Sequence, residues 1–285
     1  MDQFAEDVRT RMARSSGEAD RAKSRPIAGP ITPMLAPSIR DDFLAEGGQG
    51  VRNISVRKNK DILVSGKHYE CVYVNHDGWL SRYKILHNGS RQIIDFVLPG
   101  QIFGMQACMF NKSLYSVAAI TDSSLSAIPF AMIDAVFDRN PRLAKAMFWS
   151  AGYEAAILAE HLIDAARRSA YERISHLLLE LFVRLQAAGM TNGMSFEAPL
   201  TQEVIGDALG LTTVHVNRTV RALREDKLIA IEGKLVTILD FEALSLISDF
   251  ENSYLAGAAR ALESGMCWSK LGGGPSPGRR TECRR

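Results

Sequence analysis

The sequence predicts an α+β protein in which an N-terminal antiparallel β-roll, a long helix and a C-terminal winged helix-turn-helix follow one another. Three observations support this class. Short apolar runs between turn residues fill residues 34–129, which is typical of an antiparallel sandwich or roll. Residues 142–168 contain no proline and a single glycine, as expected of one long helix. Residues 200–239 have the pattern of a helix, a tight turn, a second helix and a two-stranded hairpin.

The β-roll is indicated first by two alternating runs, GWLSRYKIL at 78–86 and RQIIDFVL at 91–98. His87-Asn88-Gly89-Ser90 connects them, and Asn-Gly is the strongest short-range hairpin signal because both residues tolerate positive φ. Strands this short and frequent favour a jelly-roll-like antiparallel fold over a parallel sheet. Further strands are expected at CVYV (71–74), SVAAI (116–120) and SLSAIP (124–129).

The long helix is interpreted as a dimerisation helix, because about 27 residues span roughly 40 Å and such helices seldom stand alone between two domains. A helix buried within one domain is the alternative. A second helix, at 169–189, repeats apolar residues at i, i+3 and i+4 and is expected to pack into a core. One face of the long helix is apolar apart from Glu154, and its members are Leu143, Met147, Ser150, Leu158, His161, Leu162 and Ala165.

These elements divide the chain into five segments. The net charge of +2 is too small to indicate a nucleic-acid partner, so evidence for such a partner must come from the charge of a particular segment. The sequence has no long apolar run and no apolar centre in its first thirty residues, which predicts a cytoplasmic protein with no membrane partner. The expected segments are a mobile arm at 1–33, the β-roll at 34–137, the long helix at 138–168, the winged helix-turn-helix at 169–250 and an extension at 251–285, disordered from about 268.

The helix-turn-helix has suitable residues at each of its special positions. Thr201 can cap the first helix, Gly210 suits a left-handed turn, and Thr212 can cap the second helix. Ala208 is small where the two helices should approach closely. Three arginines and no acidic residue lie between Thr212 and Arg224, so the local charge favours phosphate. The residues expected to face inward from the second helix are Val216, Thr219, Val220 and Leu223.

Such a helix places its outer face in the major groove of DNA, where arginine pairs with guanine, asparagine with adenine, and methyl groups touch thymine. Double-stranded DNA is therefore the expected partner of the segment, although a solvated helix face is the alternative for each residue alone. The candidate base-reading residues are Thr213, Val214, Asn217 and Arg218. The candidate phosphate contacts are Thr201, Gln202, His215, Arg221 and, from the hairpin, Lys234.

Other chemistries find little support in the sequence. The cysteines are widely spaced and predict free thiols rather than a zinc or iron–sulfur site, with a redox-sensing thiol as the alternative. His215 has no ligand-type residue one turn away on its helix, so no metal site is expected. The absence of P-loop, G-x-S-x-G, H-E-x-x-H and paired-carboxylate motifs predicts that the protein is not an enzyme. The four cysteines are Cys71, Cys108, Cys267 and Cys283.

The segment TQEVIGDALGLTTVHVNRTVRALREDKLI, its EGK turn, and LPGQIFG after the β-hairpin resemble the Crp/Fnr family of bacterial transcription regulators. The resemblance covers roughly residues 34–250. It implies a cyclic-nucleotide-binding-like β-roll as sensor, a long dimerising helix and a DNA-binding winged helix. It also implies a homodimer on palindromic DNA sites, with RNA polymerase as a further partner if the protein is an activator.

The sensor half departs from the family members that bind cyclic AMP. Those members carry a glutamate after the glycine of the phosphate turn and an Arg-Ser pair further along. Here Met105 follows Gly104, and Tyr115-Ser116 stand in place of Arg-Ser. A cyclic phosphate would lose its charge-assisted arginine contact, so these four residues form a degenerate effector pocket and argue against cyclic AMP.

The resemblance raises two other cofactors. Oxygen-sensing members bind an iron–sulfur cluster through N-terminal cysteines, and the first seventy residues contain none. Haem would need ligands such as His68, His76 or His87, for which surface positions are the favoured interpretation. No cofactor is therefore predicted.

The predicted recognition helix departs from the best-known family pattern too. Thr213 and Val214 stand where some members have arginine and glutamate, whereas Arg218 keeps its counterpart, so a different half-site is expected. The sequence predicts a sequence-specific DNA-binding regulator. The alternative is a nucleotide- or redox-sensing module whose winged helix contacts protein.

Overall fold

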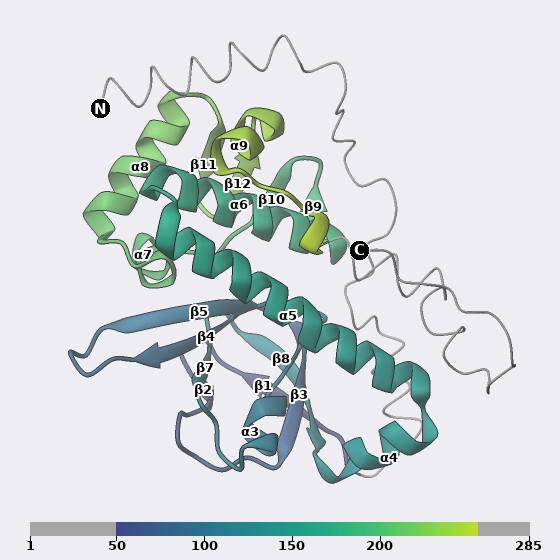
Figure 1. The fold of residues 1–285 in the computed structure, drawn as a ribbon. Helices are drawn as coiled ribbons and strands as arrows, with labels where there is room; N and C mark the ends of the chain where they lie inside the picture. Colours follow the sequence, from purple (N-terminus) through teal and green to yellow (C-terminus); the bar gives the residue numbers. More distant parts are fainter. Residues whose placement is uncertain (1–49, 256–285) are drawn as a thin grey trace, which may run out of the picture.

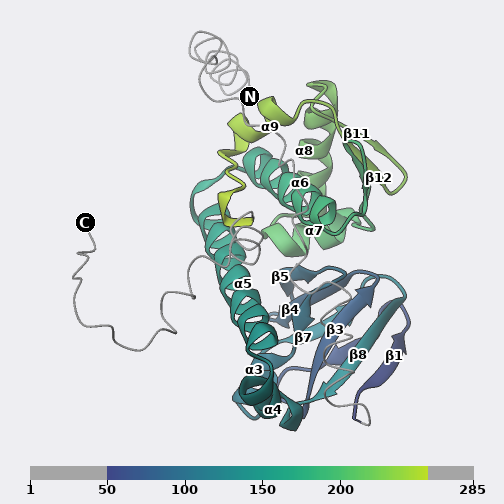
Figure 2. The ribbon, with the colours of Figure 1, turned by 90° about the vertical axis from the view of Figure 1, so that its right-hand side faces the viewer.

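The computed structural model describes residues 50–255, so the predicted arm (1–33) and disordered tail (from about 268) lie outside the described residues. A β-rich body comes first, followed by one long helix and a smaller body of helices and a sheet (Figure 1). The long helix runs along both bodies, as the rotated view shows (Figure 2). The predicted α+β class with an antiparallel N-terminal part is confirmed.

Two four-stranded antiparallel sheets make up the β-body, with strand orders β1-β8-β3-β6 and β2-β7-β4-β5. Side chains from both sheets form a core that includes Leu63, Leu80 and Phe103, each at most 2% exposed. The strands expected from the sequence are all present; β1, β2 and β6 are additional. The bounds are β1 Arg52–Val56, β2 Asp61–Leu63, β3 Cys71–Asp77, β4 Leu80–Ile85, β5 Arg91–Val97, β6 Ile102–Phe103, β7 Ser116–Ala119 and β8 Ser123–Pro129.

The turn between β4 and β5 differs from the one that Asn-Gly predicts. The amide of Leu86 donates to the carbonyl of Ser90 (2.9 Å), which leaves residues 87–89 in the loop. Gly89 has a φ of 83°, but Asn88 is not among the residues with positive φ. The sequence predicted that Asn88 and Gly89 would both take positive φ, which was wrong for Asn88. In a three-residue loop, the glycine alone takes the left-handed conformation.

The helices α3 (Met105–Met109), α4 (Ala131–Arg139), α5 (Pro141–Arg167) and α6 (Ala170–Ala187) follow the roll. A proline suits the first position of α5 because its fixed φ is already helical. The start of α6 is a capping box: the hydroxyl of Ser169 accepts from the amide of Glu172, whose carboxylate accepts from the amide of Ser169. The break between α5 and α6 thus has a clear local cause.

The apolar face predicted for α5 is divided between the protomer's own core and the surface. Met147 and Ser150 are 1% and 8% exposed. Glu154, which interrupts that face in the sequence, forms an ion pair with the buried Arg82 of β4. Leu162 and Ala165 are exposed, Leu162 to 70%. The interpretation of α5 as a dimerisation helix stays a prediction, and the charge that interrupts this face packs on a charged group of the roll.

The smaller body packs α7 (Gln202–Leu209), α8 (Thr213–Glu225) and α9 (Phe241–Ser248) around α6. The predicted core face of α6 is confirmed, with Ile174, Leu178 and Phe182 at most 3% exposed. The predicted two-stranded hairpin belongs to a four-stranded sheet in the order β11-β12-β10-β9. Two short strands were missed because they are too short for a visible alternation. The bounds are β9 Thr191–Asn192, β10 Ser195–Glu197, β11 Ile229–Glu232 and β12 Leu235–Ile238.

The two bodies touch each other along β5, α5 and α7. Arg91 of β5 forms an ion pair with Asp207 of α7 (2.7 Å), and Gln92 donates to the carbonyl of Ala208 (3.1 Å). Beyond α9 the chain returns to α6, where Leu255 is 1% exposed. Within residues 50–255, no helix combines the length and the apolar character needed to cross a membrane.

Candidate nucleic-acid interface

The helix-turn-helix is formed by α7 and α8, and each helix begins with the predicted cap. The hydroxyl of Thr201 accepts from the amide of Val204 (3.2 Å), and that of Thr212 accepts from the amide of His215 (3.3 Å). Gly210 ends α7 with a φ of 66°, a left-handed conformation that glycine adopts without strain. The turn between the helices is therefore set by local chemistry.

The small residue at the close approach is Gly206 rather than Ala208. A Cβ on Gly206 would lie 2.5 Å from the carbonyl oxygen of Leu211, in the turn. Gly206 is buried, whereas Ala208 is only half-buried and its carbonyl accepts from Gln92. The role expected of Ala208 thus belongs to Gly206, because the turn backbone passes over that position.

The inner and outer faces of α8 follow the predicted division. Val216, Thr219 and Leu223 are at most 6% exposed, and Val220 packs against the same core. The outer face carries the predicted base-reading residues, all exposed: Thr213, Val214, Asn217 and Arg218. Val214 is 77% exposed, and its methyl groups suit contact with a thymine methyl.

The arginines of α8 differ in their surroundings. Arg221 forms an exposed ion pair with Glu225 one turn later (2.7 Å). Glu225 lies just past the stretch that was expected to be free of acidic residues, so the sequence prediction missed this pair. Among residues 50–255, Arg218 has no ion-pair or hydrogen-bond partner. Its guanidinium can therefore donate to a nucleic acid without first breaking an internal contact.

The wing is the β11–β12 hairpin, in which Glu232 faces Leu235 across a two-residue turn. Gly233 occupies the first turn position with a φ of 62°, so the exposed side chain of Lys234 follows it at the tip. The other predicted phosphate contacts lie near the starts of α7 and α8. Thr201 and Gln202 are exposed, whereas His215 is half-buried. The assignment of all five to phosphate stays a prediction.

Two residues of the predicted effector pocket, Met105 and Tyr115, belong to different apolar clusters. Met105 packs against the apolar cluster around Val72 and Ile102, while Tyr115 belongs to the core between the two sheets. Gly104 has a φ of 91°, and a Cβ there would approach Tyr73 to 3.1 Å. Ser116 is buried, and its hydroxyl accepts from the amide of Ser65. The glycine suits the turn, and the assignment of the four residues to an effector pocket stays a prediction.

The interior of the roll holds a charged group that the sequence prediction missed. The guanidinium of Arg82 lies over the ring of Tyr115, 4.7 Å from its centroid, and pairs with Glu154 of α5. The Arg82 side chain is 3% exposed. The cavity beside this pair, lined also by Asp95 and Tyr153, has a volume of about 10 Å³, enough for about one water molecule. The apolar face interrupted by Glu154 was the sequence signal for this buried arginine.

A larger cavity of about 360 Å³ lies where β5, α5 and α7 meet. Its arginine, Arg173, already donates to the carbonyls of Ala165, Arg168 and Leu209. The rest of its lining is mostly apolar. The cavity therefore offers no uncommitted arginine for a phosphate group.

Metal and redox chemistry have little basis among the described residues. No group of three potential ligands (His, Cys, Asp or Glu) gathers in residues 50–255. His76 contacts the hydroxyl of Ser126 (2.8 Å), while His68 and His87 are exposed. Cys71 and Cys108 are free thiols. Burial raises the pKa of Cys108 to about 11, which disfavours the reactive thiolate.

An apolar stripe remains uncovered on α5. Phe148 and Leu162 are 68% and 70% exposed. The intervening small residues are exposed as well, and a Cβ on Gly152 would meet nothing. The spacing alternates four and three residues, as at the a and d positions of a coiled coil. This α5 stripe consists of Phe148, Gly152, Ala155, Ala159, Leu162 and Ala166.

Comparison with known families matches both halves of the chain. Residues 53–140 match the model of the cyclic nucleotide-binding domain, and residues 172–247 match that of the Crp-like helix-turn-helix domain. The two matches lie on the β-roll and on the α6–α9 body respectively. Their order along the chain is the one expected from the sequence.

Named relatives agree with these matches. The chain is 27% identical over 195 residues to the regulatory protein HlyX of Actinobacillus pleuropneumoniae, covering 68% of this chain and 81% of that protein. It is 27% identical over 189 residues to the transcriptional activator protein Anr of Pseudomonas protegens, covering 66% and 77%. These proteins are regulators, not enzymes, in agreement with the sequence prediction.

A solved structure shares the fold. FixK2 from Bradyrhizobium japonicum aligns with a TM-score of 0.64 and 24% identity, covering 70% of this chain and 98% of that one. The same arrangement of a β-roll, a long helix and a helix-turn-helix body therefore exists in a known protein.

Proposed function

Because the chain belongs to the Crp/Fnr family of transcription regulators, we propose that it binds a palindromic DNA site as a homodimer and does not use cyclic AMP in the family's usual way. In this proposal the sensor spans residues 34–137, the dimerisation helix 138–168 and the DNA-binding domain 169–250. RNA polymerase is a further partner if the regulator activates transcription.

The observation that carries DNA recognition is the outer face of α8. An α-helix fits the major groove of B-DNA, and this face presents Val214 beside Asn217 and Arg218, which has no partner among the described residues. Arg218 and Asn217 read base edges, and Thr213 and Val214 contact thymine methyl groups. Thr201, Gln202, His215, Arg221 and Lys234 bind phosphates and fix the register of the helix.

The α5 stripe supports the homodimer. Two copies of the stripe would pair their Phe148 and Leu162 side chains, and the small residues between them would let the backbones approach. Dimerisation would place two copies of α8 on the same face of the DNA, about one helical turn apart. The two-fold symmetry of such a dimer is the reason for expecting a palindromic site.

The sensor interior supports independence from cyclic AMP. A small-molecule site usually needs about 300–1,000 Å³, whereas about 10 Å³ remains beside Arg82 and Glu154. The cavity of about 360 Å³ where β5, α5 and α7 meet is large enough, but its arginine is already bonded to backbone carbonyls. Arg82 is already neutralised by Glu154, so it is not available to a cyclic phosphate. Met105 and Tyr115 offer no replacement charge.

The alternative is a redox- or nucleotide-sensing module whose winged helix contacts protein. The raised pKa of Cys108 weighs against a reactive thiol in the sensor. DNA binding and protein binding also differ in salt dependence, because neutralised phosphates release counterions. A steep loss of affinity with salt therefore supports the DNA-binding function.

The test is selection of bound sites from a random duplex pool, followed by anisotropy titrations of the selected site at several salt concentrations. We expect an enriched palindrome whose affinity falls steeply with salt and is unchanged by added cyclic AMP. Selection repeated with cell extract reports whether another effector is needed. Failure to enrich any site under either condition would contradict the proposal, and a large gain with cyclic AMP would contradict its sensor part.

A further inference from the structure

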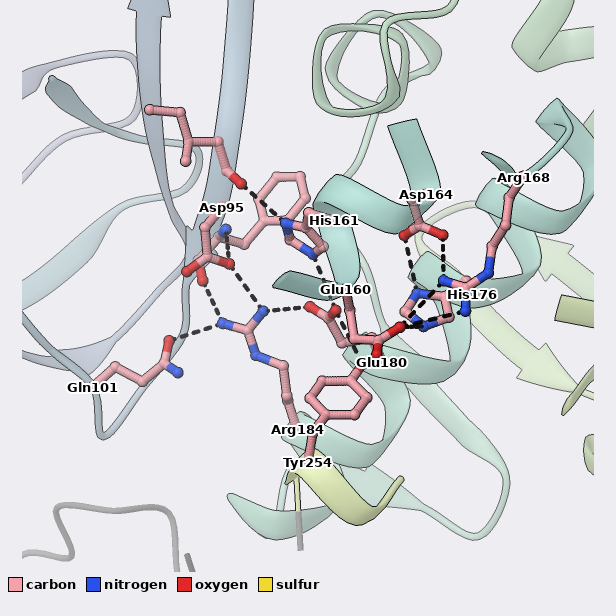
Figure 3. Close-up of polar contacts among 12 residues, drawn as sticks. Asp95, Gln101, Glu160, His161, Asp164, Arg168, His176, Glu180, Arg184 and Tyr254 are labelled. Carbon is pink, nitrogen blue, oxygen red and sulfur yellow. Dashed lines mark hydrogen bonds and ion pairs between the residues drawn. The ribbon is translucent and has the colours of Figure 1, made fainter. Parts of the chain in front are cut away.

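A cluster of four charged side chains joins the roll to the helix-turn-helix body (Figure 3). Asp95 comes from β5, His161 from α5, and Glu180 and Arg184 from α6. We call these four residues the interdomain clamp. Two are acidic and two are basic, and the side chains of Glu180 and Arg184 are at most 1% exposed.

Arg184 makes most of the contacts between the bodies. Its Nη1 donates to Asp95 Oδ1 (3.0 Å) and Glu180 Oε1 (2.8 Å), and its Nη2 donates to the carbonyl of Phe96 (2.5 Å) and to Gln101 Oε1 (3.1 Å). Three of these acceptors belong to the roll. Gln101 directly precedes β6, which leads to the turn at Gly104. A single guanidinium of the DNA-binding domain thus reaches the core of the sensor.

His161 fixes the second contact between the bodies. Its Nδ1 lies 3.0 Å from the carbonyl oxygen of Ile94, and its Nε2 lies 3.0 Å from Glu180 Oε2. Both partners are acceptors without a hydrogen atom, so both ring nitrogens must donate and the ring must be an imidazolium. His161 therefore completes the charge balance around Glu180. The hydroxyl of Tyr254 also donates to Glu180, at 3.3 Å.

A buried cluster of this kind is better suited to define one arrangement than to add stability. Two desolvated ion pairs gain little over a well-packed apolar contact, but every displaced arrangement would leave a buried charge without its partner. The other ion pair between the bodies, Arg91–Asp207, has side chains 34% and 22% exposed, so it constrains the arrangement less.

The clamp acts at the helix that carries the DNA-reading element. α6 packs against α8 on one side and against α5 through the clamp on the other. The position of α8 relative to α5 therefore depends on the clamp. In a dimer formed through α5, this position determines the distance between the two copies of α8.

We propose that the interdomain clamp determines the spacing between the two half-sites that the dimer accepts, with Arg184 as the positioning residue. The proposal rests on the proposed function, since it assumes a DNA-binding dimer. One base pair corresponds to about 3.4 Å along the DNA and about 35° around it. A rigidly held α8 therefore selects one spacing, whereas a loosely held one accepts neighbouring spacings.

The test compares Arg184→Met with Arg82→Met in the full chain. Both substitutions remove a buried arginine, but Arg82 pairs with Glu154 of α5, and within residues 50–255 no hydrogen bond or ion pair joins it to the DNA-binding domain. Binding is measured to duplexes in which the selected half-sites are separated by the preferred spacer or by one or two base pairs more or fewer. A single half-site duplex serves to measure base reading alone.

The wild type and Arg82→Met should prefer one spacer by about tenfold or more, whereas Arg184→Met should reduce this ratio to about threefold or less. The half-site affinity and base preference of Arg184→Met should be unchanged. A folded Arg184→Met variant with the wild-type spacer profile would overturn the proposal. If Arg184→Met does not fold, His161→Gln takes its place, because it keeps polar contacts but removes the charge, and the same criteria apply.

Small-angle X-ray scattering without DNA provides a second readout. Loss of the clamp should increase the radius of gyration and the maximum dimension, and Arg82→Met should not. An unchanged scattering curve for folded Arg184→Met and His161→Gln would contradict a clamp that holds the bodies together. If the wild type binds no DNA, the proposed function fails, and the scattering result alone decides whether the clamp exists.

Discussion

The replacement Leu162→Ala tests whether the α5 stripe is a dimer interface. Full burial of a leucine side chain contributes about 1.5–3 kcal/mol, and Leu162 is 70% exposed. Covering that exposed part in both protomers would contribute about 2–4 kcal/mol per dimer, and alanine would keep a minor part of it. The substitution should therefore weaken the dimer by about 2 kcal/mol, or about 30-fold in its dissociation constant.

The assay is sedimentation equilibrium over a range of protein concentrations. Leu246→Ala is the matched control, because Leu246 lies on α9, outside the stripe, and is 47% exposed. The control should dimerise as the wild type does. Neither substitution creates a buried cavity, so the two thermal stabilities should be similar at concentrations where both proteins are monomeric. Equal dimer dissociation constants for Leu162→Ala and Leu246→Ala would refute the reasoning.

Two other perturbations probe the helix-turn-helix and the clamp. Gly206→Ala should destabilise the domain by about 2 kcal/mol or more and lower its melting temperature, because its Cβ would lie 2.5 Å from the Leu211 carbonyl oxygen. A melting temperature equal to that of the wild type would exclude the close approach. Burial alone would lower the pKa of His161, but Glu180 and Asp95 raise it to about 9. The charged His161 therefore stabilises the folded protein fully below about pH 6.5, and this stabilisation is lost as the pH rises through 9. The free energy of unfolding should fall by up to about 3 kcal/mol. The charged groups facing the His161 ring are Glu180, Asp95 and Arg184, and Tyr254 contacts Glu180. Chemical denaturation between pH 7 and 10.5 should show this loss of stability in the wild type but not in His161→Gln. Identical pH profiles of the two proteins would contradict the prediction.

Much of the fold could be predicted from local signals. The long helix, the second helix and the helix-turn-helix each have a strong period and recognisable caps, and Ser169, Thr201 and Thr212 cap helices in the structure. The short strands β9 and β10 could not be predicted, since two or three residues carry no measurable alternation. Their pairing depends on distant strands.

The charged groups of the interior were harder to predict for a different reason. Asp95 lies between the apolar residues Ile94 and Phe96 of β5, and Glu180 and Arg184 lie at i, i+4 spacing among the apolar residues in the second half of α6. The sequence shows that such residues are unusual, but only the fold shows that they meet. The sequence also did not show which face of α5 is exposed. Arg82 and the clamp bind the opposite face of the helix, so the α5 stripe points outward.

The most direct test of base reading compares the sites selected by the wild type, Arg218→Ala and Arg221→Ala. Arg218 has no internal partner in the described part of the chain, so its loss should weaken specific binding by about 1–3 kcal/mol and relax the preference at one base pair of each half-site. Arg221→Ala should weaken binding equally for all sequences and reduce the salt slope by about one. An Arg218→Ala variant that selects the wild-type site with wild-type affinity would contradict the account that the outer face of α8 reads DNA.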